Sequence, residues 1–448
     1  MIFTRLAGPA EYGHYVLIFA WSMIIYGFGA QWMRFAYFGV YDTQRFGEYA
    51  ASLARLLACG VVIVALMLAA LGILGWFEPS FLVAVFALVC GMTLYEAAFE
   101  VARTLPYAGG AALSMILRTV LTVMFGSANL WLGGGARGLA IAVAAAHIIA
   151  AVPSLGAFSS VRPSAGSRTA TLHILTYGWP LLFSFGINAV GQSIDRLVLA
   201  HYAGNAALGP YGVVADVVRQ VFTVFGEAII LSLVTLAKQH ANEGNLAAAN
   251  GLMQKAFNAC LAAAAFGAAF FIVFGDLVLR TVLNPEFVAP AHGLIPIFAV
   301  AFAFLTMRNF YFAQVIYFTS ASYLELLVTL LFLVVSGVLS VLLVPTYGAH
   351  GAAYALLAAS ILSCIAFMVL GRRWYRLPID LNGLTLIPIL AILIVFGARA
   401  TAEFVPSGPI PLILDAVAFA LFGTFAIRRF RLLNAMPAHA AAEQMPAG

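Results

Sequence analysis

Long apolar segments constrain this chain more than any other feature of its sequence. A soluble domain carries about 25% charged residues, whereas only 9% of these 448 residues are charged. Helices of about 20 apolar residues span a bilayer, and an open sheet edge cannot lie in lipid. The sequence therefore predicts an all-α, polytopic transmembrane helix bundle. Its thirteen apolar segments are 15–39, 54–76, 80–102, 110–132, 138–159, 173–203, 208–237, 251–274, 291–318, 323–344, 349–370, 383–401 and 410–427.

Basic residues are unevenly distributed over the connections between these segments. The cytoplasmic side of a membrane protein carries the excess of Lys and Arg. One alternating set of connections, together with the segment ends beside them, holds fourteen: Arg45, Arg55, Arg103, Arg118, Arg162, Arg168, Lys238, Lys255, Arg372, Arg373, Arg376, Arg428, Arg429 and Arg431. The opposite set holds four: Arg5, Arg137, Arg280 and Arg399. The C-terminus is therefore predicted to be cytoplasmic, and with thirteen spans the N-terminus is outside.

Two short motifs recur in the same order in both halves of the chain. Residues 7–15 and 203–211 share the pattern A-G-x-A-x-x-G-x-Y at an offset of 196, and 135–140 resembles 348–353 at an offset of 213. This order predicts an internal duplication that gives two parallel repeats of six helices. The second copy begins with segment 173–203, which has no counterpart in the first. We therefore expect fourteen spans, with thirteen present and the first missing from this chain.

The segments and the repeat together predict how the chain is divided. An N-terminal lobe that lacks its first helix is followed by a cytoplasmic loop, a C-terminal lobe, two additional transmembrane helices and a disordered cytoplasmic tail. In that order, these parts cover residues 1–160, 161–172, 173–371, 372–431 and 432–448.

Polar and ionisable residues form stripes inside three of the apolar segments. Such groups are costly in a membrane and usually face a cavity. Helical spacing places each set on one face. The stripes are Glu96 and Glu100 in 80–102, Ser184, Asn188, Gln192 and Asp195 in 173–203, and Asp216, Arg219, Gln220, Thr223 and Glu227 in 208–237. They either line a lumen or hold helices together through pairs such as Glu100 with Arg103 and Asp216 with Arg219.

Four arginines lie within the segments rather than at their ends: Arg34, Arg196, Arg219 and Arg308. Guanidinium groups bind phosphate oxygens in a bidentate geometry, so a lumen lined by these side chains would attract an anionic substrate. The chain holds only two lysines among its 22 basic residues, which a genome biased toward arginine codons would also explain.

No motif of a catalytic or nucleotide-binding site occurs in the sequence. The Walker A, G-x-S-x-G and dinucleotide-binding patterns are absent. The four cysteines, Cys59, Cys90, Cys260 and Cys364, have no metal-binding or paired spacing. No connection is long enough to form an extramembrane domain. We therefore expect a transporter and not an enzyme, without cofactor, metal or nucleic-acid partner.

Four short stretches are typical of a known family: LAGPAEYGHY at 6–15, Gln31-Trp32-Met33-Arg34, Asp195-Arg196 followed by Ala203-Gly204, and the turn at 347–353. They resemble polysaccharide-unit flippases of the Wzx type, within the multidrug/oligosaccharidyl-lipid/polysaccharide exporter (MOP) superfamily. The resemblance implies two six-helix lobes around a central cavity, with two further helices. It also implies that undecaprenyl-diphosphate-linked oligosaccharides move from the inner to the outer leaflet of the bacterial cytoplasmic membrane, by alternating access, for O-antigen or exopolysaccharide synthesis.

This resemblance gives the candidate residues roles. The diphosphate would bind Arg34, Arg196, Arg219 and Arg308, and glycan hydroxyls would meet Asn188, Gln192 and other polar lumen groups such as Gln220. Carboxylates including Asp195, Asp216, Glu227, Glu96 and Glu100 are candidates for coupling to a proton or a sodium ion. The expected partners are the lipid-linked oligosaccharide, membrane lipids and the polysaccharide polymerase or glycosyltransferase machinery.

Two other functions remain open. A multidrug cation exporter of the same superfamily would need an acidic cavity, and the candidate lumen carries charges of both signs. A membrane-embedded transferase acting on polyprenyl phosphates would need a loop that carries a catalytic motif.

Overall fold

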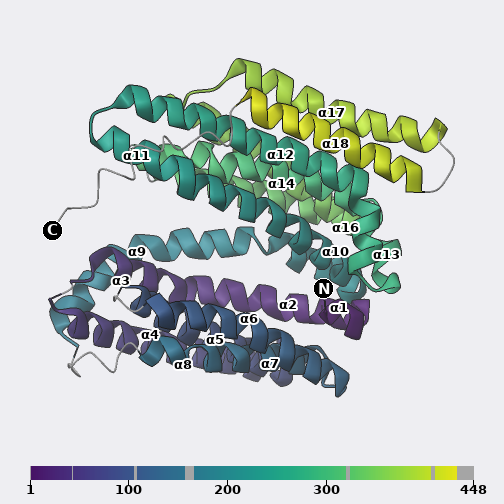
Figure 1. The fold of residues 1–448 in the computed structure, drawn as a ribbon. Coiled ribbons are helices and arrows are strands. Elements are labelled where there is room, and N and C mark those ends of the chain that lie inside the picture. Colours follow the sequence, from purple (N-terminus) through teal and green to yellow (C-terminus); the bar gives the residue numbers. More distant parts are fainter. Residues whose placement is uncertain are drawn as a thin grey trace. The chain divides into compact units, whose positions relative to one another are not determined.

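The computed structural model describes residues 2–42, 44–104, 108–156, 166–318, 323–404 and 409–430. Over these residues the secondary structure is helical, which confirms the all-α fold of a multi-pass membrane protein (Figure 1). The predicted tail and the first part of the predicted loop at 161–172 lie outside the described residues.

The helices follow one another with short connections. Up to the middle of the chain they are α1 (Phe3–Leu6), α2 (Pro9–Tyr26), the π-helical η1 (Gly27–Gln31), α3 (Trp32–Val40), α4 (Phe46–Ile73), α5 (Pro79–Arg103), α6 (Ala108–Trp131), α7 (Gly135–Ala150), α8 (Val152–Leu155) and α9 (Arg168–Gly191). They continue as α10 (Ile194–Ile229), η3 (Ile230–Val234), α11 (Thr235–Asn242), α12 (Leu246–Val282), α13 (Pro285–Ala291), α14 (Leu294–Phe310), η4 (Phe312–Gln314), α15 (Val315–Phe318), α16 (Tyr323–Gly371), α17 (Leu381–Phe404) and α18 (Pro409–Arg429).

Eleven helical stretches among the described residues are long and apolar enough to cross a membrane. The thirteen predicted segments map onto eleven stretches because two of these, Arg168–Asn242 and Tyr323–Gly371, each contain two segments. Both are interrupted by a glycine with a positive φ, Gly204 at 76° and Gly348 at 54°. Glycine adopts this conformation without a steric penalty. The number of membrane crossings stays a prediction.

The chain folds back on itself at Gly348. A Cβ atom on Gly351 would lie only 2.4 Å from the carbonyl oxygen of Leu343. A continuous helix would separate these two positions by about 12 Å. Gly135, which the offset of 213 relates to Gly348, also has a positive φ, of 66°. The two copies of this motif thus share a glycine with a positive φ.

The helices pack into two compact units. Unit 1 consists of Met1–Gly212, Leu283–Pro290 and Ser336–Ala352, and unit 2 of Val213–Val282, Ala291–Val335 and Ala353–Gly448. Unit 1 thus combines the predicted N-terminal lobe with α9 and the first part of α10. The predicted lobe boundaries stay a prediction.

Small residues set the packing inside unit 1. α5 contacts α2, α4, α6 and α7, and its Leu88 is fully buried. A Cβ atom on Gly91 of α5 would lie 2.7 Å from the carbonyl oxygen of Ala144 on α7. Such close approach of backbones is how transmembrane helices gain contact area in a solvent that is itself apolar.

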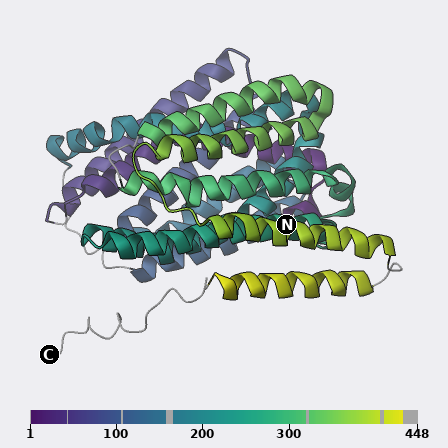
Figure 2. The same cartoon turned by 90° about the horizontal axis from the view of Figure 1, so that it is seen from above.

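In unit 2 the two C-terminal helices are joined to the rest through α12. α17 packs along α12 and α18 packs beside α17, with only limited contact to α12 (Figures 1 and 2). Both helices are apolar over a length that can cross a membrane. The prediction of two additional helices after residue 371 is therefore confirmed as far as secondary structure is concerned.

Candidate functional site

Five charged side chains form a cluster inside unit 1, contributed by α3, α5 and α6. Arg34 donates to Glu96, and its Nη1 lies 3.8 Å from Oε2 of Glu100. Arg103 donates to Glu100 at 2.6 Å, and Nη1 of Arg118 lies 3.5 Å from Oε1 of Glu96. Three guanidinium groups therefore meet two carboxylates, and the cluster carries a net charge of +1.

Local helix geometry explains why these groups meet. Glu96 and Glu100 are four residues apart on α5 and so share one face. The π-helical turn η1 stands directly before α3 and shifts the helical register ahead of Arg34. Arg34 also lies over the ring of Phe35, with its guanidinium carbon 4.6 Å from the ring centre. The cluster lies at what the charge bias predicts to be the cytoplasmic end of these helices.

Arg34 of the cluster and Tyr26, eight residues before it, each have a hydrogen-bond donor without an acceptor among the described residues. Nε of Arg34 and the hydroxyl of Tyr26 are both buried, and neither has a hydrogen-bond partner among the described residues. Buried donors without an acceptor are energetically unfavourable. An anionic ligand at this place would supply acceptors to Arg34 in the geometry that guanidinium groups favour.

Unit 2 contains a buried arginine on α14. Arg308 on α14 is 5% exposed. It donates to Oγ1 of Thr329 on α16 at 3.0 Å, and Oε1 of Glu325 lies 3.6 Å from it. Its guanidinium carbon is 5.4 and 5.9 Å from the ring centres of Phe332 and Phe367. The side chain is thus packed and its charge is paired, while its Nε, like that of Arg34, is a buried donor without an acceptor among the described residues.

The predicted stripe on α10 is partly solvent-exposed in unit 2. Arg219 donates to Asp216 at 2.8 Å, which confirms the predicted pairing at i,i+3. Gln220 and Glu227 are exposed. The stripe therefore faces away from the packed interior of its own unit.

The predicted residues around the start of α10 divide into two kinds. Asn188 and Gln192, at the end of α9, are exposed. Asp195 and Arg196 are buried, at 5% and 6% exposure, and the hydroxyl of Tyr211 donates to Asp195. This pair is thus part of the interior of unit 1.

The four predicted arginines are shared between the units. Arg34 and Arg196 belong to unit 1, and Arg219 and Arg308 to unit 2. Their convergence on one substrate stays a prediction. Among the described residues, no group of three or more His, Cys, Asp or Glu side chains is placed to hold a metal ion, and the four cysteines are free thiols.

Sequence reasoning missed two components. Arg118 was counted with the cytoplasmic charges, although it lies against Glu96 in the cluster. The partners of Arg308 were not recognised, although Glu325 and Thr329 form an i,i+4 polar stripe in an otherwise apolar segment. The stripe was a usable signal, but only the fold shows that Arg308 faces it.

Solved structures with the same arrangement of helices are transporters. The lipid II flippase MurJ in an inward closed conformation aligns with a TM-score of 0.69 and 11% identity, over 94% of this chain and 92% of that chain. An inward-facing multidrug resistance transporter of the MATE family aligns with a TM-score of 0.61 and 15% identity, over 83% and 92%. A MOP-superfamily transporter from Pyrococcus furiosus aligns with a TM-score of 0.51 and 17% identity, over 83% and 87%.

Sequence comparison adds no closer relative, since neither a family profile nor a curated protein matches this chain. The identities to the solved structures are low, but the alignments cover most of both chains. This chain therefore has the fold of the MOP-superfamily transporters.

Proposed function

We propose that this protein is a flippase that moves undecaprenyl-diphosphate-linked oligosaccharides from the inner to the outer leaflet of the bacterial cytoplasmic membrane, for surface polysaccharide synthesis. The observation that carries the proposal is the charged cluster of Arg34, Glu96, Glu100, Arg103 and Arg118 within membrane-spanning helices. Charges at such positions are costly and are usually functional. An excess of guanidinium groups suits a diphosphate.

The carboxylates give the cluster a way to bind and release. Without substrate, Glu96 and Glu100 keep the arginines neutralised. An arriving diphosphate competes for Arg34, because both kinds of anion use the same guanidinium donors. A carboxylate released from its arginine can take up a proton or a sodium ion, which would couple transport to an ion gradient.

The fold supports transport rather than catalysis. MurJ is named as a flippase of lipid II, which is a lipid-linked substrate, and its structure aligns over nearly the whole chain. Alternating access between two lobes is the corresponding mechanism for this chain. The candidates for binding the diphosphate in later states of the transport cycle are Arg196, Arg219 and Arg308. The candidate partner proteins are the polysaccharide polymerase and glycosyltransferases.

A flipping assay tests the proposal. The purified chain is reconstituted into liposomes with an undecaprenyl diphosphate disaccharide that carries a fluorophore on the sugar. Dithionite added outside quenches only the outer leaflet, so flipping exposes the protected inner half. We expect protein-dependent quenching. Its rate should fall at least about tenfold in Arg34→Ala, because that variant loses one charge-assisted contact with the diphosphate. No flipping by the unaltered chain would refute the proposal.

The second candidate is a multidrug cation exporter. The presence of Glu96 and Glu100 in a spanning helix and the likeness to MATE transporters favour it. Ethidium efflux from the same liposomes, or increased drug resistance in cells, would support it over the flippase. Turnover of a polyprenyl phosphate substrate by purified protein would instead indicate a transferase.

A further inference from the structure

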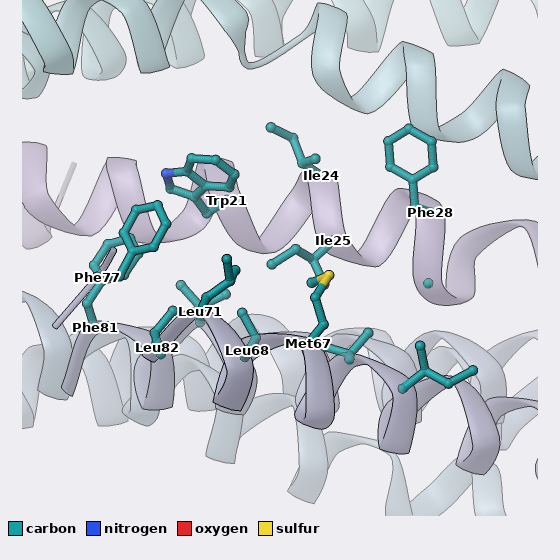
Figure 3. Close-up of a pocket in the computed structure, with 14 residues that line it drawn as sticks. Trp21, Ile24, Ile25, Phe28, Met67, Leu68, Leu71, Phe77, Phe81 and Leu82 are labelled. Atoms are coloured by element: carbon teal, nitrogen blue, oxygen red, sulfur yellow. The ribbon is translucent and has the colours of Figure 1, made fainter. Parts of the chain in front are cut away.

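An apolar cavity of about 410 Å³ lies between α2, η1, α4 and α5 of unit 1 (Figure 3). Its 14 lining residues are Gly29 and thirteen residues with apolar or aromatic side chains. The large apolar and aromatic side chains in this lining include Trp21, Ile25, Met67, Leu71, Phe77 and Phe81. The volume is within the range of about 300–1,000 Å³ that is typical of ligand pockets.

The cavity forms because two helices touch at one point and are separated beyond it. A Cβ atom on Gly60 of α4 would lie 2.9 Å from the carbonyl oxygen of Gly29 in η1. From this crossing the cavity extends along α2 as far as Trp21, which corresponds to about 12 Å of helix. α5 packs against both α2 and α4 and closes the wedge on the third side.

The cavity and Arg34 of the charged cluster lie on the same continuous helical stretch, although no residue of the cluster lines the cavity. Arg34 follows Gly29 by five residues, or about 7 Å along a helix. The stretch from Pro9 to Val40 therefore carries an apolar cavity and then a cationic site. A ligand that matches both has an anionic group joined directly to a hydrocarbon chain.

We propose that this cavity holds the part of the polyprenyl chain nearest the diphosphate, while the diphosphate binds at Arg34. The inference rests on the proposed function and deepens it. Apolar cavities exclude water and accept hydrocarbons. Because head and tail are covalently joined, binding at Arg34 raises the effective concentration of the chain at the cavity.

The position of Arg34 favours this lipid over bulk phospholipid. Arg34 lies six residues before the end of α3 at Val40, or about 9 Å inside the helix end. Its side chain is only 15% exposed. A phospholipid headgroup stays at the interface, so the first carbons of its chains would not be at the cavity. A substrate that carries its diphosphate to Arg34 directs its prenyl chain from there toward the cavity.

Matched tryptophan variants of α4 test the proposal. Ile63 and Met67 line the cavity and are 66% and 43% exposed. Val62 and Leu66 are their sequence neighbours, are 57% and 66% exposed, and do not line it. We compare Ile63→Trp/Met67→Trp with Val62→Trp/Leu66→Trp, after size-exclusion chromatography and thermal melting show that both are folded. The probes are undecaprenyl diphosphate, inorganic diphosphate and phosphatidylglycerol.

We expect the cavity variant to bind undecaprenyl diphosphate about tenfold more weakly than the control variant, which costs about 1.4 kcal/mol. Inorganic diphosphate should inhibit the binding of undecaprenyl diphosphate to both variants equally. Phosphatidylglycerol should not displace undecaprenyl diphosphate from either variant. A diazirine on the first isoprene units should label peptides of α2 and α4 in the unaltered chain, which tests the site even if the cavity variant does not fold.

The outcomes separate this inference from the proposed function. Equal affinity of the two variants for undecaprenyl diphosphate, or labelling confined to other helices, overturns the cavity assignment and leaves the flippase intact. Displacement by phosphatidylglycerol at equal concentration overturns it as well, because the cavity would then take any acyl chain. Absence of undecaprenyl diphosphate binding by the unaltered chain overturns both.

Discussion

Gly13 and Gly209, which the sequence repeat relates by an offset of 196, pack against each other's helices in unit 1. A Cβ atom on Gly13 would lie 1.9 Å from the carbonyl oxygen of Asn205, and one on Gly209 would lie 2.1 Å from that of Pro9. Since Pro9 and Asn205 are also separated by 196 positions, the contact is reciprocal. The two copies of the motif thus contact each other through a local, approximately two-fold symmetric interface.

Because each glycine lies against the backbone of the other helix, a side chain at either position would clash with that backbone. We expect Gly13→Ala to lower the thermal stability of the purified protein, because the new methyl group must displace backbone at a cost of about 1–3 kcal/mol. Gly251→Ala on α12 is the matched control, since a Cβ atom there meets nothing within 4 Å. Thermal melting in detergent measures both. A Gly13→Ala protein as stable as the control would show that this contact does not form.

Arg34 and Glu96 should be energetically coupled. Removing either charge leaves the other partly buried and partly uncompensated, so we expect Arg34→Met and Glu96→Gln each to destabilise the protein, and the double variant to cost less than the sum. Coupling of roughly 0.5–3 kcal/mol is typical for residues in one network. The double-mutant cycle is measured by thermal melting, and additive effects would argue against the pair.

The same pair shows where sequence reasoning ends. The pairs Glu100 with Arg103 and Asp216 with Arg219 could be predicted, because both members are on one helix at i,i+3. Glu96 is 62 positions from Arg34. Apolar periodicity gives the length of each helix and the residues on each face, but not which helices become neighbours.

Some features of the fold could likewise be predicted from the sequence and others could not. The repeat motifs indicated the turn at Gly204, because glycine at a joint between two apolar segments marks a change of direction. The cavity beside Gly29 and Gly60 left no comparable trace. It depends on the angle at which two helices diverge, and an apolar lining has the same composition as a lipid-facing surface.

Arg308 should contribute to stability in a way that lysine cannot replace. Its guanidinium donates to Thr329 while it remains near Glu325, and a lysine ammonium is a compact charge that does not reproduce a planar fork. We expect Arg308→Lys to lower thermal stability measurably and Arg308→Ala to lower it further, because the alanine leaves Thr329 without its donor and Glu325, which is 35% exposed, without its counter-charge. Protein amount and flipping are measured together. Reduced flipping in a fully stable Arg308→Ala protein would instead indicate direct substrate contact.

Arg219 provides the contrasting case, because its pair with Asp216 is 40% and 36% exposed. Exposed pairs contribute about 0–1 kcal/mol, so Arg219→Ala should leave the melting temperature almost unchanged. If Arg219 meets the substrate diphosphate, the same variant should reduce flipping in liposomes, and Arg219→Lys should restore part of it because the positive charge is retained. Asp216→Asn is the control, since it removes the charge of this pair and keeps the guanidinium of Arg219 in the protein. Equal flipping by the unaltered chain and Arg219→Ala would remove Arg219 from the transport path.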